Sequence, residues 1–302
     1  MMNSLESKIV FAKKAFGKKS RVFPLKKSNS MFKVFLPNGK KRVCWIWFDK
    51  KKVLRAKAFQ QFAFENHLPV PKIFSLKKSP DFCLLEFEFV EGTPVTAQWA
   101  KMSEPERIFL IEQIAEILAK LHSVKPNYKA KKTDLEWKDR TQSWGSFVRK
   151  NIEINLQIAV KNGIVKESFA KKILFFVYNT PLPEKVNPCI CHGDLWLENI
   201  LVNKSRKINA VIDWKNAFLG HCLFDVAITE NALKAVKPDL SKHFLKTYAE
   251  MGGKIGENYA FEKKTYLLFK FCQFLSLASA GKKQAKDIKK MVKEIKKMMK
   301  ER

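Results

Sequence analysis

Residues 188–214 read PCICHGDLWLENILVNKSRKINAVIDW and alternate short apolar runs with polar segments. This alternation is typical of short strands joined by loops, and loops held on a rigid scaffold often carry functional side chains. Asp194 follows the first apolar run by a few residues, and Asp213 directly follows the last one. The stretch therefore predicts a site built from loops between short strands.

The spacing of polar residues in this stretch favours phosphoryl-transfer chemistry. Asp194 precedes Asn199 by five positions, the D-x-x-x-x-N spacing that protein-kinase catalytic loops use for a base and a metal ligand. Asp213 comes fourteen positions after Asn199, where a metal carboxylate is expected. Magnesium prefers hard oxygen ligands and keeps several waters, so these two side chains suffice beside phosphate oxygens. We expect Asp194 to act on an acceptor hydroxyl.

His192 and Asp225 each have more than one interpretation. His192 could act as a base by itself, although a single histidine in such a loop more commonly holds the loop by hydrogen bonding. Asp225, by its spacing alone, fits an ordinary helix N-cap.

Several of these segments resemble the catalytic core of the aminoglycoside phosphotransferase family, which is similar to fructosamine, choline, homoserine and methylthioribose kinases. The resemblance extends to the hinge-like strand 84–92 and the helix-like stretch 117–122, and it covers most of residues 28–250. The segments of the core are His192-Gly193-Asp194-Leu195 with Asn199, Val211-Ile212-Asp213-Trp214 and Asp225-Val226-Ala227. The resemblance implies an α+β, protein-kinase-like two-lobed fold that uses ATP with magnesium.

The resemblance also implies roles for individual residues. Asp194 would be the catalytic base, Asn199 and Asp213 the magnesium ligands, and His192 and Asp225 supports for the loop. In the small lobe the nucleotide-binding residues would be Ser28 and Asn29 in a phosphate loop, and Glu88 and Val90, whose backbone groups would face adenine.

The pattern of elements predicts a small antiparallel β lobe over residues 1–92 and a helical lobe over 93–302. The helical lobe would hold a catalytic loop at 192–199 and a metal loop at 212–215. Its first long helix is predicted by the capping box at Ser103-Glu104-Pro105-Glu106. The small-lobe elements expected are a helix at 5–16, strands at 31–37, 42–48, 72–76 and 82–90, and a helix at 53–66.

The small lobe departs from the family pattern at its phosphate clamp. The family usually has a basic residue on the third strand, paired with an acid on the next helix, but Trp45 and Ala56 occupy those positions here. The joint absence of the basic residue and the acid makes physical sense, because either charge alone would be buried without its partner. Either another cation reaches the phosphates, or the chain is a pseudokinase; the cations considered are Lys26, Lys27, Lys33 and Arg55.

The formal charge of +29, from 58 basic and 29 acidic residues, favours neutral or anionic partners and disfavours polycations such as aminoglycosides. Nucleic acid is not an expected partner, since no zinc spacing, helix-turn-helix signal or interleaved aromatic and basic pattern occurs. The stretch 282–302 predicts a basic amphipathic helix. Its apolar stripe could dock on the helical lobe, or the helix could contact an anionic membrane surface.

Together these features predict a cytoplasmic, ATP- and magnesium-dependent kinase that phosphorylates a hydroxyl of a sugar, a metabolite or a glycolipid head group. The alternative is a pseudokinase or another non-catalytic binding protein on the same scaffold. A protein kinase would need the H-R-D, D-F-G and A-P-E sequences, which are missing. The six scattered cysteines are expected to be buried reduced thiols.

Overall fold

The computed structural model describes the chain except residues 1–3, 26–28, 126–142, 279–281 and 301–302. The strands are β1 (Arg21–Pro24), β2 (Met31–Phe35), β3 (Lys41–Trp47), β4 (Ile73–Lys78), β5 (Cys83–Glu88), β6 (Thr93–Pro94), β7 (Cys189–Cys191), β8 (Ile200–Val202), β9 (Ile208–Val211) and β10 (Phe218–Gly220). The helices are α1 (Leu5–Phe16), α2 (Lys50–Glu65), α3 (Val95–Gln98), α4 (Glu104–Ser123), α5 (Trp144–Lys161), α6 (Glu167–Tyr178), α7 (Leu223–Val236), α8 (Pro238–Glu250), α9 (Tyr259–Leu277) and α10 (Lys282–Lys300). The 3-10 turns are η1 (Trp99–Lys101), η2 (Leu197–Asn199) and η3 (Trp214–Asn216).

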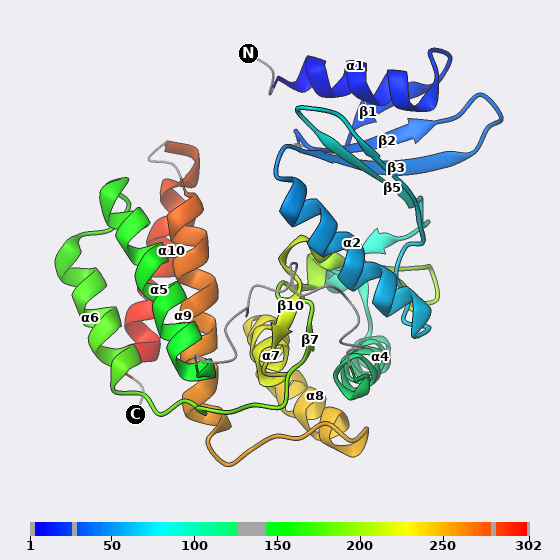
Figure 1. The fold of residues 1–302 in the computed structure, drawn as a ribbon. Coiled ribbons are helices and arrows are strands. Elements are labelled where there is room, and N and C mark those ends of the chain that lie inside the picture. Colours follow the sequence, from blue (N-terminus) through cyan, green and yellow to red (C-terminus); the bar gives the residue numbers. More distant parts are fainter. Residues whose placement is uncertain (1–3, 26–28, 126–142, 279–281, 301–302) are drawn as a thin grey trace.

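The small lobe is an antiparallel sheet with strand order β1-β2-β3-β5-β4. Helices α1 and α2 cover its two faces (Figure 1). Successive residues of β3 alternate between them, since Cys44 and Ile46 pack in the cluster that contains Ala12 of α1, whereas Trp45 packs with Ala56 of α2. The two-residue period of a strand explains this division.

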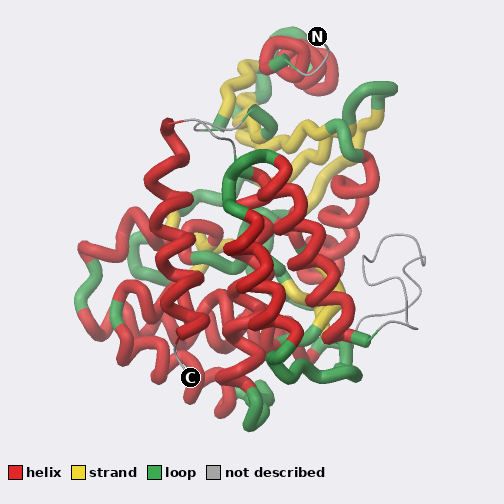
Figure 2. Tube along the Cα trace, turned by 90° about the vertical axis from the view of Figure 1, so that its left-hand side faces the viewer, coloured by secondary structure: helices red, strands yellow, loops and turns green. Residues whose placement is uncertain are grey.

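The helical lobe surrounds a large apolar core that includes buried aromatic side chains of α5, α7, α8 and α9. Helices gather below the strands of the small lobe in Figure 2. Two small sheets, β6-β8-β9 and β7-β10, lie in this lobe and connect to the loops of the candidate site. The fold is therefore α+β with a small antiparallel lobe and a larger helical lobe, as predicted.

The predicted capping box begins α4. The Ser103 backbone N–H donates to Glu106 Oε2 at 2.7 Å, and the Glu106 N–H donates to Ser103 Oγ at 3.4 Å. The turn between β2 and β3 also forms at the predicted Pro37-Asn38-Gly39, where Gly39 has a φ of 79°. The sequence interpretation missed β1, because Arg21–Pro24 is too short to show a period. It also began α2 three residues late, because Asp49 caps the helix ahead of its apolar pattern.

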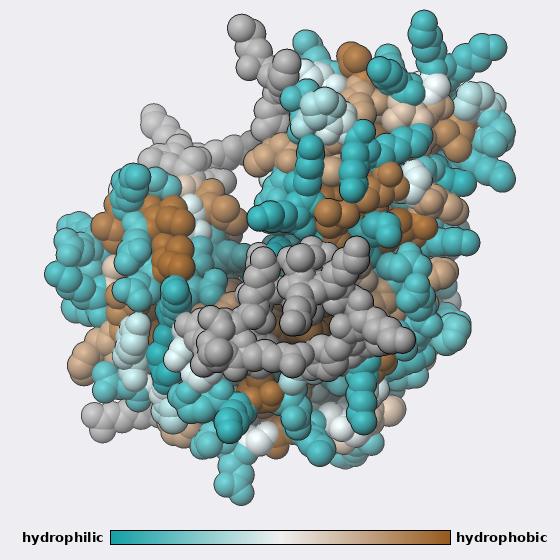
Figure 3. Space-filling view, in the orientation of Figure 1, coloured by the Kyte–Doolittle hydropathy of each residue, from teal (hydrophilic) through white to brown (hydrophobic). Residues whose placement is uncertain are grey.

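The C-terminal helix α10 lies along α9 (Figure 1). Ile295 is fully buried, and the other apolar residues of its stripe are partly buried against the core: Ile288, Met291, Val292, Met298 and Met299. The stripe thus docks on the helical lobe. Most of the face drawn in Figure 3 is hydrophilic, as the large excess of lysine requires.

Among the described residues, no helix is long and apolar enough to cross a membrane. The six cysteines form no disulfide, and all but the half-buried Cys222 are buried, so the prediction of buried reduced thiols is confirmed for five of them.

Candidate active site

The predicted catalytic loop, residues 192–199, begins directly after β7 and contains Gly193, which has a φ of 73°. A Cβ atom at this position would lie 2.3 Å from the Asn216 carbonyl oxygen, a distance that no side chain tolerates. Glycine is therefore required for both its backbone conformation and its close contact with the segment after β9.

Asp225 binds this loop from the first turn of α7. Its carboxylate is fully buried and accepts hydrogen bonds from the backbone N–H groups of His192, at 2.5 Å, and Gly193, at 2.8 Å. His122 Nε2 lies 3.7 Å from the same carboxylate. Two bonds from loop amides to a buried carboxylate fit the predicted role of Asp225 as a support for the loop.

His192 is fully buried and hydrogen-bonded through both ring nitrogens. Nδ1 accepts from the Asp194 N–H at 3.3 Å, so Nε2 carries the proton that is donated to the Ile212 carbonyl at 3.0 Å. Burial lowers the pKa of His192 below its ordinary value. The imidazole is thus a neutral link between the catalytic loop and the strand β9, and it has no free nitrogen to act as a base.

Asp194 lies at the centre of the loop with both carboxylate oxygens oriented. Oδ1 accepts from Trp196 Nε1 at 3.1 Å and lies 3.0 Å from Lys270 Nζ, while Oδ2 accepts from Asn216 Nδ2 at 3.1 Å. Each carboxylate oxygen can accept two hydrogen bonds. One lone pair of Oδ2 therefore has no partner among the described residues.

The ion pair with Lys270 controls the charge of Asp194. Burial is the largest single effect and would raise the pKa of the Asp194 carboxyl, but the Lys270 ammonium, with smaller contributions from His192 and Lys215, holds the pKa below its ordinary value. Lys270 lies on α9, is itself buried, and also donates to Gln273 Oε1 at 2.9 Å. Asp194 is consequently ionised at neutral pH.

Asn199 and Asp213 are brought together by the strands on either side of them. Asn199 Nδ2 donates to the Asp194 carbonyl at 2.8 Å, and the Ile212 N–H donates to the Asn199 carbonyl at 2.9 Å. Asp213 adopts a left-handed conformation with a φ of 71°, which is uncommon for a residue other than glycine and often marks a functional position. A carboxylate and an amide oxygen are the donors that magnesium prefers.

Cations from α2 and η3 surround Asp213. Lys215 Nζ lies 2.6 Å from Asp213 Oδ2, and Arg55 Nη2 donates to the Lys215 carbonyl at 3.4 Å. Burial, followed by Arg55 and Lys215, lowers the pKa of Lys52, whereas Asp213 is among the groups that raise it. Lys52, Arg55 and Lys215 thus outnumber the carboxylates of Asp213 and Asp49, which leaves a local positive charge that phosphate oxygens would neutralise.

Of the four cations considered from the sequence, only Arg55 reaches this cluster in the described structure. Lys33 instead lies over the rings of Phe35 and Phe89, 5.0 and 4.0 Å from their centroids. Lys26 and Lys27 lie outside the described residues. Arg55 thus becomes the leading candidate for the phosphate clamp.

Trp45 and Ala56 lie in one apolar cluster between the sheet and α2, together with Val53, Leu85 and Phe87. Trp45 is only 5% exposed and Ala56 only 3% exposed. Apolar packing has therefore replaced both members of the expected ion pair at once, which leaves neither charge buried without a partner.

The residues predicted to bind the nucleotide are only partly accounted for. Ser28 lies outside the described residues, and the Asn29 carbonyl accepts from Lys8 Nζ at 3.0 Å. The Glu88 N–H donates to the Lys72 carbonyl at 2.8 Å, so this N–H is not available to adenine. In the described part of the chain, no hydrogen bond reaches the backbone of Val90. Their role in binding stays a prediction.

A cleft of about 330 Å³ opens beside Gly193, between α2, α5 and α9. Its charged lining residues are Lys51, Lys52, Arg55 and Asp49, and its other lining residues are uncharged amides and phenylalanines in addition to Gly193. The lining is thus positive by two charges, with three cations against one anion. A cleft of this charge attracts anions and repels cationic groups.

Lys270, Asn216 and Lys215 were missed by the sequence interpretation. Lys215 and Asn216 follow Asp213 closely, so their position next to a predicted metal ligand was an available signal. Lys270 had no such signal, because it is one of many lysines on a helix far along the chain.

The fold and this site define the chain as a kinase-like phosphotransferase scaffold. The model of the phosphotransferase enzyme family matches residues 27–262, and the chain belongs to this family. An aminoglycoside 3'-phosphotransferase of Escherichia coli is 22% identical over 183 residues, which are 61% of this chain and 65% of that protein. The chain thus matches somewhat less than two thirds of that relative's length.

Solved structures of aminoglycoside phosphotransferases share the fold. A type VIII aminoglycoside-3'-phosphotransferase superposes with a TM-score of 0.64 at 16% identity, covering 88% of this chain and 98% of that one. A thermostable mutant in ternary complex with ADP and hygromycin B gives 0.67 at 13% identity, covering 96% and 97%. An enzyme from Streptomyces rimosus, in complex with ADP and streptomycin, gives 0.65 at 15% identity, covering 89% and 98%.

Proposed function

We propose that this protein is an ATP- and magnesium-dependent kinase that phosphorylates a hydroxyl group of a small neutral or anionic molecule. The observation that carries the proposal is the arrangement at Asp194, whose carboxylate is fixed by Trp196 and Asn216 and keeps an acceptor position on Oδ2. Membership of the phosphotransferase family supports the same reaction class.

In the proposed reaction Asp194 Oδ2 accepts the hydrogen bond of the acceptor hydroxyl and orients its oxygen toward the γ-phosphorus. The new oxygen–phosphorus bond forms as the bond from the γ-phosphorus to the bridging oxygen breaks, and the hydroxyl proton passes to Asp194. The low pKa of Asp194 suits orientation and late proton transfer, because the carboxylate stays ionised before the reaction.

Asn199 and Asp213 would hold magnesium, which neutralises charge on the phosphate oxygens when it is bound. Arg55 and Lys52 would bind those oxygens from α2, in place of the strand cation that Trp45 has replaced. Lys215 would leave Asp213 when the metal binds, because its ammonium now occupies the same carboxylate oxygen.

The charge of the cleft supports a neutral or anionic acceptor, such as a sugar, a phosphorylated metabolite or a glycolipid head group. Lys51, Lys52 and Arg55 outnumber Asp49 there, and the buried Lys270 adds a further cation next to Asp194. Before ATP binds, a polycationic aminoglycoside would meet an excess of like charge in this cleft.

A non-catalytic scaffold is the second candidate, favoured by the apolar cluster at Trp45 and Ala56. Thermal unfolding with ATP and magnesium separates the two, because binding to the native state raises the midpoint of unfolding. We expect a shift with both ligands together, and a smaller shift for Asp213→Ala. No shift under any condition would favour the non-catalytic scaffold.

The activity itself is tested by transfer of labelled γ-phosphate to a panel of neutral sugars, sugar phosphates, anionic glycolipids and aminoglycosides. Asp194→Asn should lower turnover by about 10²- to 10⁴-fold, while the thermal shift with ATP and magnesium persists. Wild-type turnover by this variant would remove Asp194 from the proposed role. Phosphorylation of aminoglycosides alone would refute the argument from charge.

A further inference from the structure

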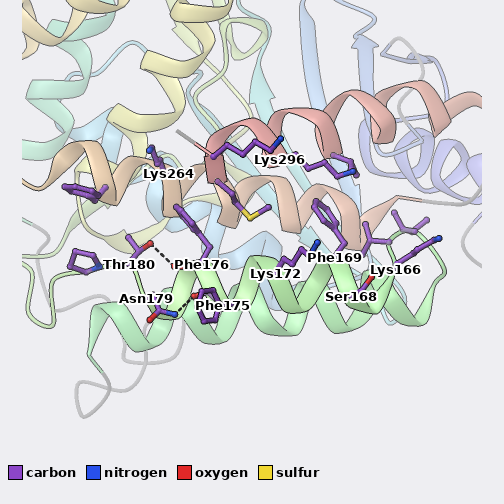
Figure 4. A pocket seen from close by; sticks show the side chains of 17 residues that line it. Lys166, Ser168, Phe169, Lys172, Phe175, Phe176, Asn179, Thr180, Lys264 and Lys296 are labelled. Atoms are coloured by element: carbon purple, nitrogen blue, oxygen red, sulfur yellow. Dashed lines mark hydrogen bonds between the residues drawn. The ribbon is translucent and has the colours of Figure 1, made fainter. Parts of the chain in front are cut away.

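A second and larger concavity lies away from the catalytic loop, between α6 and α10. It measures about 1090 Å³, and its lining also includes Phe261 and Lys264 from the first turns of α9 (Figure 4). This volume slightly exceeds the roughly 300–1,000 Å³ of typical small-molecule sites in proteins. None of the residues assigned to the catalytic loop or the metal loop lines it.

The walls of this groove are mainly apolar. Their apolar side chains come from both helices and from the start of α9, and they include Phe169, Phe175, Phe176, Phe261, Val292 and Met299. Phe175 remains 74% exposed and Phe261 51% exposed although both lie beside the groove. Large aromatic side chains left open to water in a concavity are typical of a binding surface.

The charged residues that line the groove are all cations: Lys166, Lys172, Lys264, Lys296 and Lys300. Lys172 extends from α6 and Lys296 from α10, and Lys296 Nζ lies 5.7 Å from the centre of the Phe169 ring (Figure 4). Among the described residues, no carboxylate lies within ion-pair distance of either lysine. The groove therefore combines an apolar floor with positive charge at Lys172 and Lys296.

The remaining polar groups offer little to a ligand with many hydrogen-bonding groups. Asn179 Nδ2 donates to the Phe175 carbonyl at 2.7 Å, and Thr180 Oγ1 donates to the Phe176 carbonyl at 2.9 Å, as the dashed lines in Figure 4 mark. An extended peptide would leave buried backbone groups unpaired against such walls. A hydrocarbon chain needs no partners, and its anionic head group would find the lysines.

We propose that the groove between α6 and α10 binds a single-chain anionic amphiphile from solution, with its hydrocarbon chain along α6 and its head group between Lys172 and Lys296. Lys172 is near the middle of α6, so the helix extends about 9 Å beyond it to Tyr178. The lining of the groove continues through Asn179, Thr180 and Pro181, which leaves room for an acyl chain of medium length. A concave groove encloses such a chain better than it fits a flat bilayer surface.

The test is displacement of the fluorescent fatty acid cis-parinaric acid from the full-length protein by dodecanoate, dodecanol or dodecylamine, all below micelle-forming concentrations. We expect saturable binding, displacement by dodecanoate, and at least tenfold weaker competition by the neutral alcohol and the cationic amine. Equal competition by all three would overturn the role of the lysines, and absence of probe binding would overturn the site.

Variants locate the site. Lys172→Glu with Lys296→Glu should weaken binding at least tenfold, and Ser168→Trp, at an exposed position on the groove wall, should block it. The matched control is Lys242→Glu with Lys246→Glu on α8, where both side chains are highly exposed. Unchanged binding by the groove variants would refute the assignment, provided that their thermal unfolding matches the wild type.

Sedimentation with vesicles of phosphatidylcholine and phosphatidylglycerol distinguishes binding to a bilayer from binding of the free amphiphile. Binding to these vesicles without binding of the monomeric probe would overturn the proposal in favour of a membrane contact. Phosphoryl transfer plays no part in any of these measurements, so their outcome is independent of the proposed function.

Discussion

Lys270 Nζ lies 3.0 Å from Asp194 Oδ1, so a buried ammonium on α9 is paired with the carboxylate that would orient the acceptor hydroxyl. This pair lowers the pKa of Asp194 against the opposing effect of burial. It also adds positive charge to the acceptor side of the site. In the proposed reaction, one lysine would thus affect both the ionisation of Asp194 and the choice of acceptor.

Lys270→Gln should raise the pKa of Asp194, because burial would then act without the opposing ammonium. The midpoint of the Asp194 carboxyl titration, followed by carbon-13 NMR, should move to higher pH. The acid limb of the pH–rate profile should move in the same direction, since the carboxylate must be ionised to orient the hydroxyl. Lys246→Gln, at an exposed site on α8, is the control; equal midpoints in both variants would contradict the role of the ion pair.

Arg55→Gln should weaken binding of ATP with magnesium by about tenfold or more, as expected when a charge-assisted hydrogen bond is lost. The reason is its position beside Lys215 and Asp213, where phosphates are expected. Isothermal titration calorimetry measures the affinity. Lys50→Gln changes an exposed lysine at the start of the same helix and should leave affinity unchanged; equal affinities for both variants would exclude Arg55 as the clamp.

Trp45→Lys should lower the free energy of unfolding by several kcal/mol, because it buries an ammonium in the apolar cluster with Ala56. Adding Ala56→Glu should recover part of this loss by supplying a partner. Urea unfolding measures both variants, and Val10→Lys, at a position 66% exposed on α1, should cost less than about 0.5 kcal/mol. A double variant no more stable than Trp45→Lys alone would disprove the explanation that the basic residue and its acidic partner are absent together because either charge alone would be buried unpaired.

His221 lies just before α7, with its Nδ1 atom 2.8 Å from the Tyr266 hydroxyl, and it provides a pH-dependent contribution to stability. Burial, with a smaller effect of His122, lowers its pKa from 6.5 to about 4, so the unfolded chain binds a proton in this interval that the native state does not. The free energy of unfolding should therefore fall as the pH drops from 6.5 to 4, by up to about 1.4 kcal/mol per pH unit for one proton. Denaturant titrations across this range should give a smaller slope for His221→Gln, and an identical slope would contradict the assignment.

Local patterns in the sequence predicted much of the fold. The capping box at Ser103, the turn at Gly39 and the period of the strands depend on neighbouring residues, so they could be recognised without tertiary structure. The same holds for the loops that carry Asp194 and Asp213, whose spacing alone indicated their chemistry. The sequence did not reveal β1, which is too short to show a period, and it placed the start of α2 too late.

Residues 188–214 therefore determined by themselves the class of reaction expected and the three residues proposed for it: Asp194, Asn199 and Asp213. Tertiary structure alone decided which distant side chains surround them. It brings Lys270 from α9 and Arg55 from α2 to the site, and it builds the groove between α6 and α10. The physical reason is that such contacts depend on how helices pack, and a lysine has the same identity in the sequence whether it lies in solvent or beside a buried carboxylate.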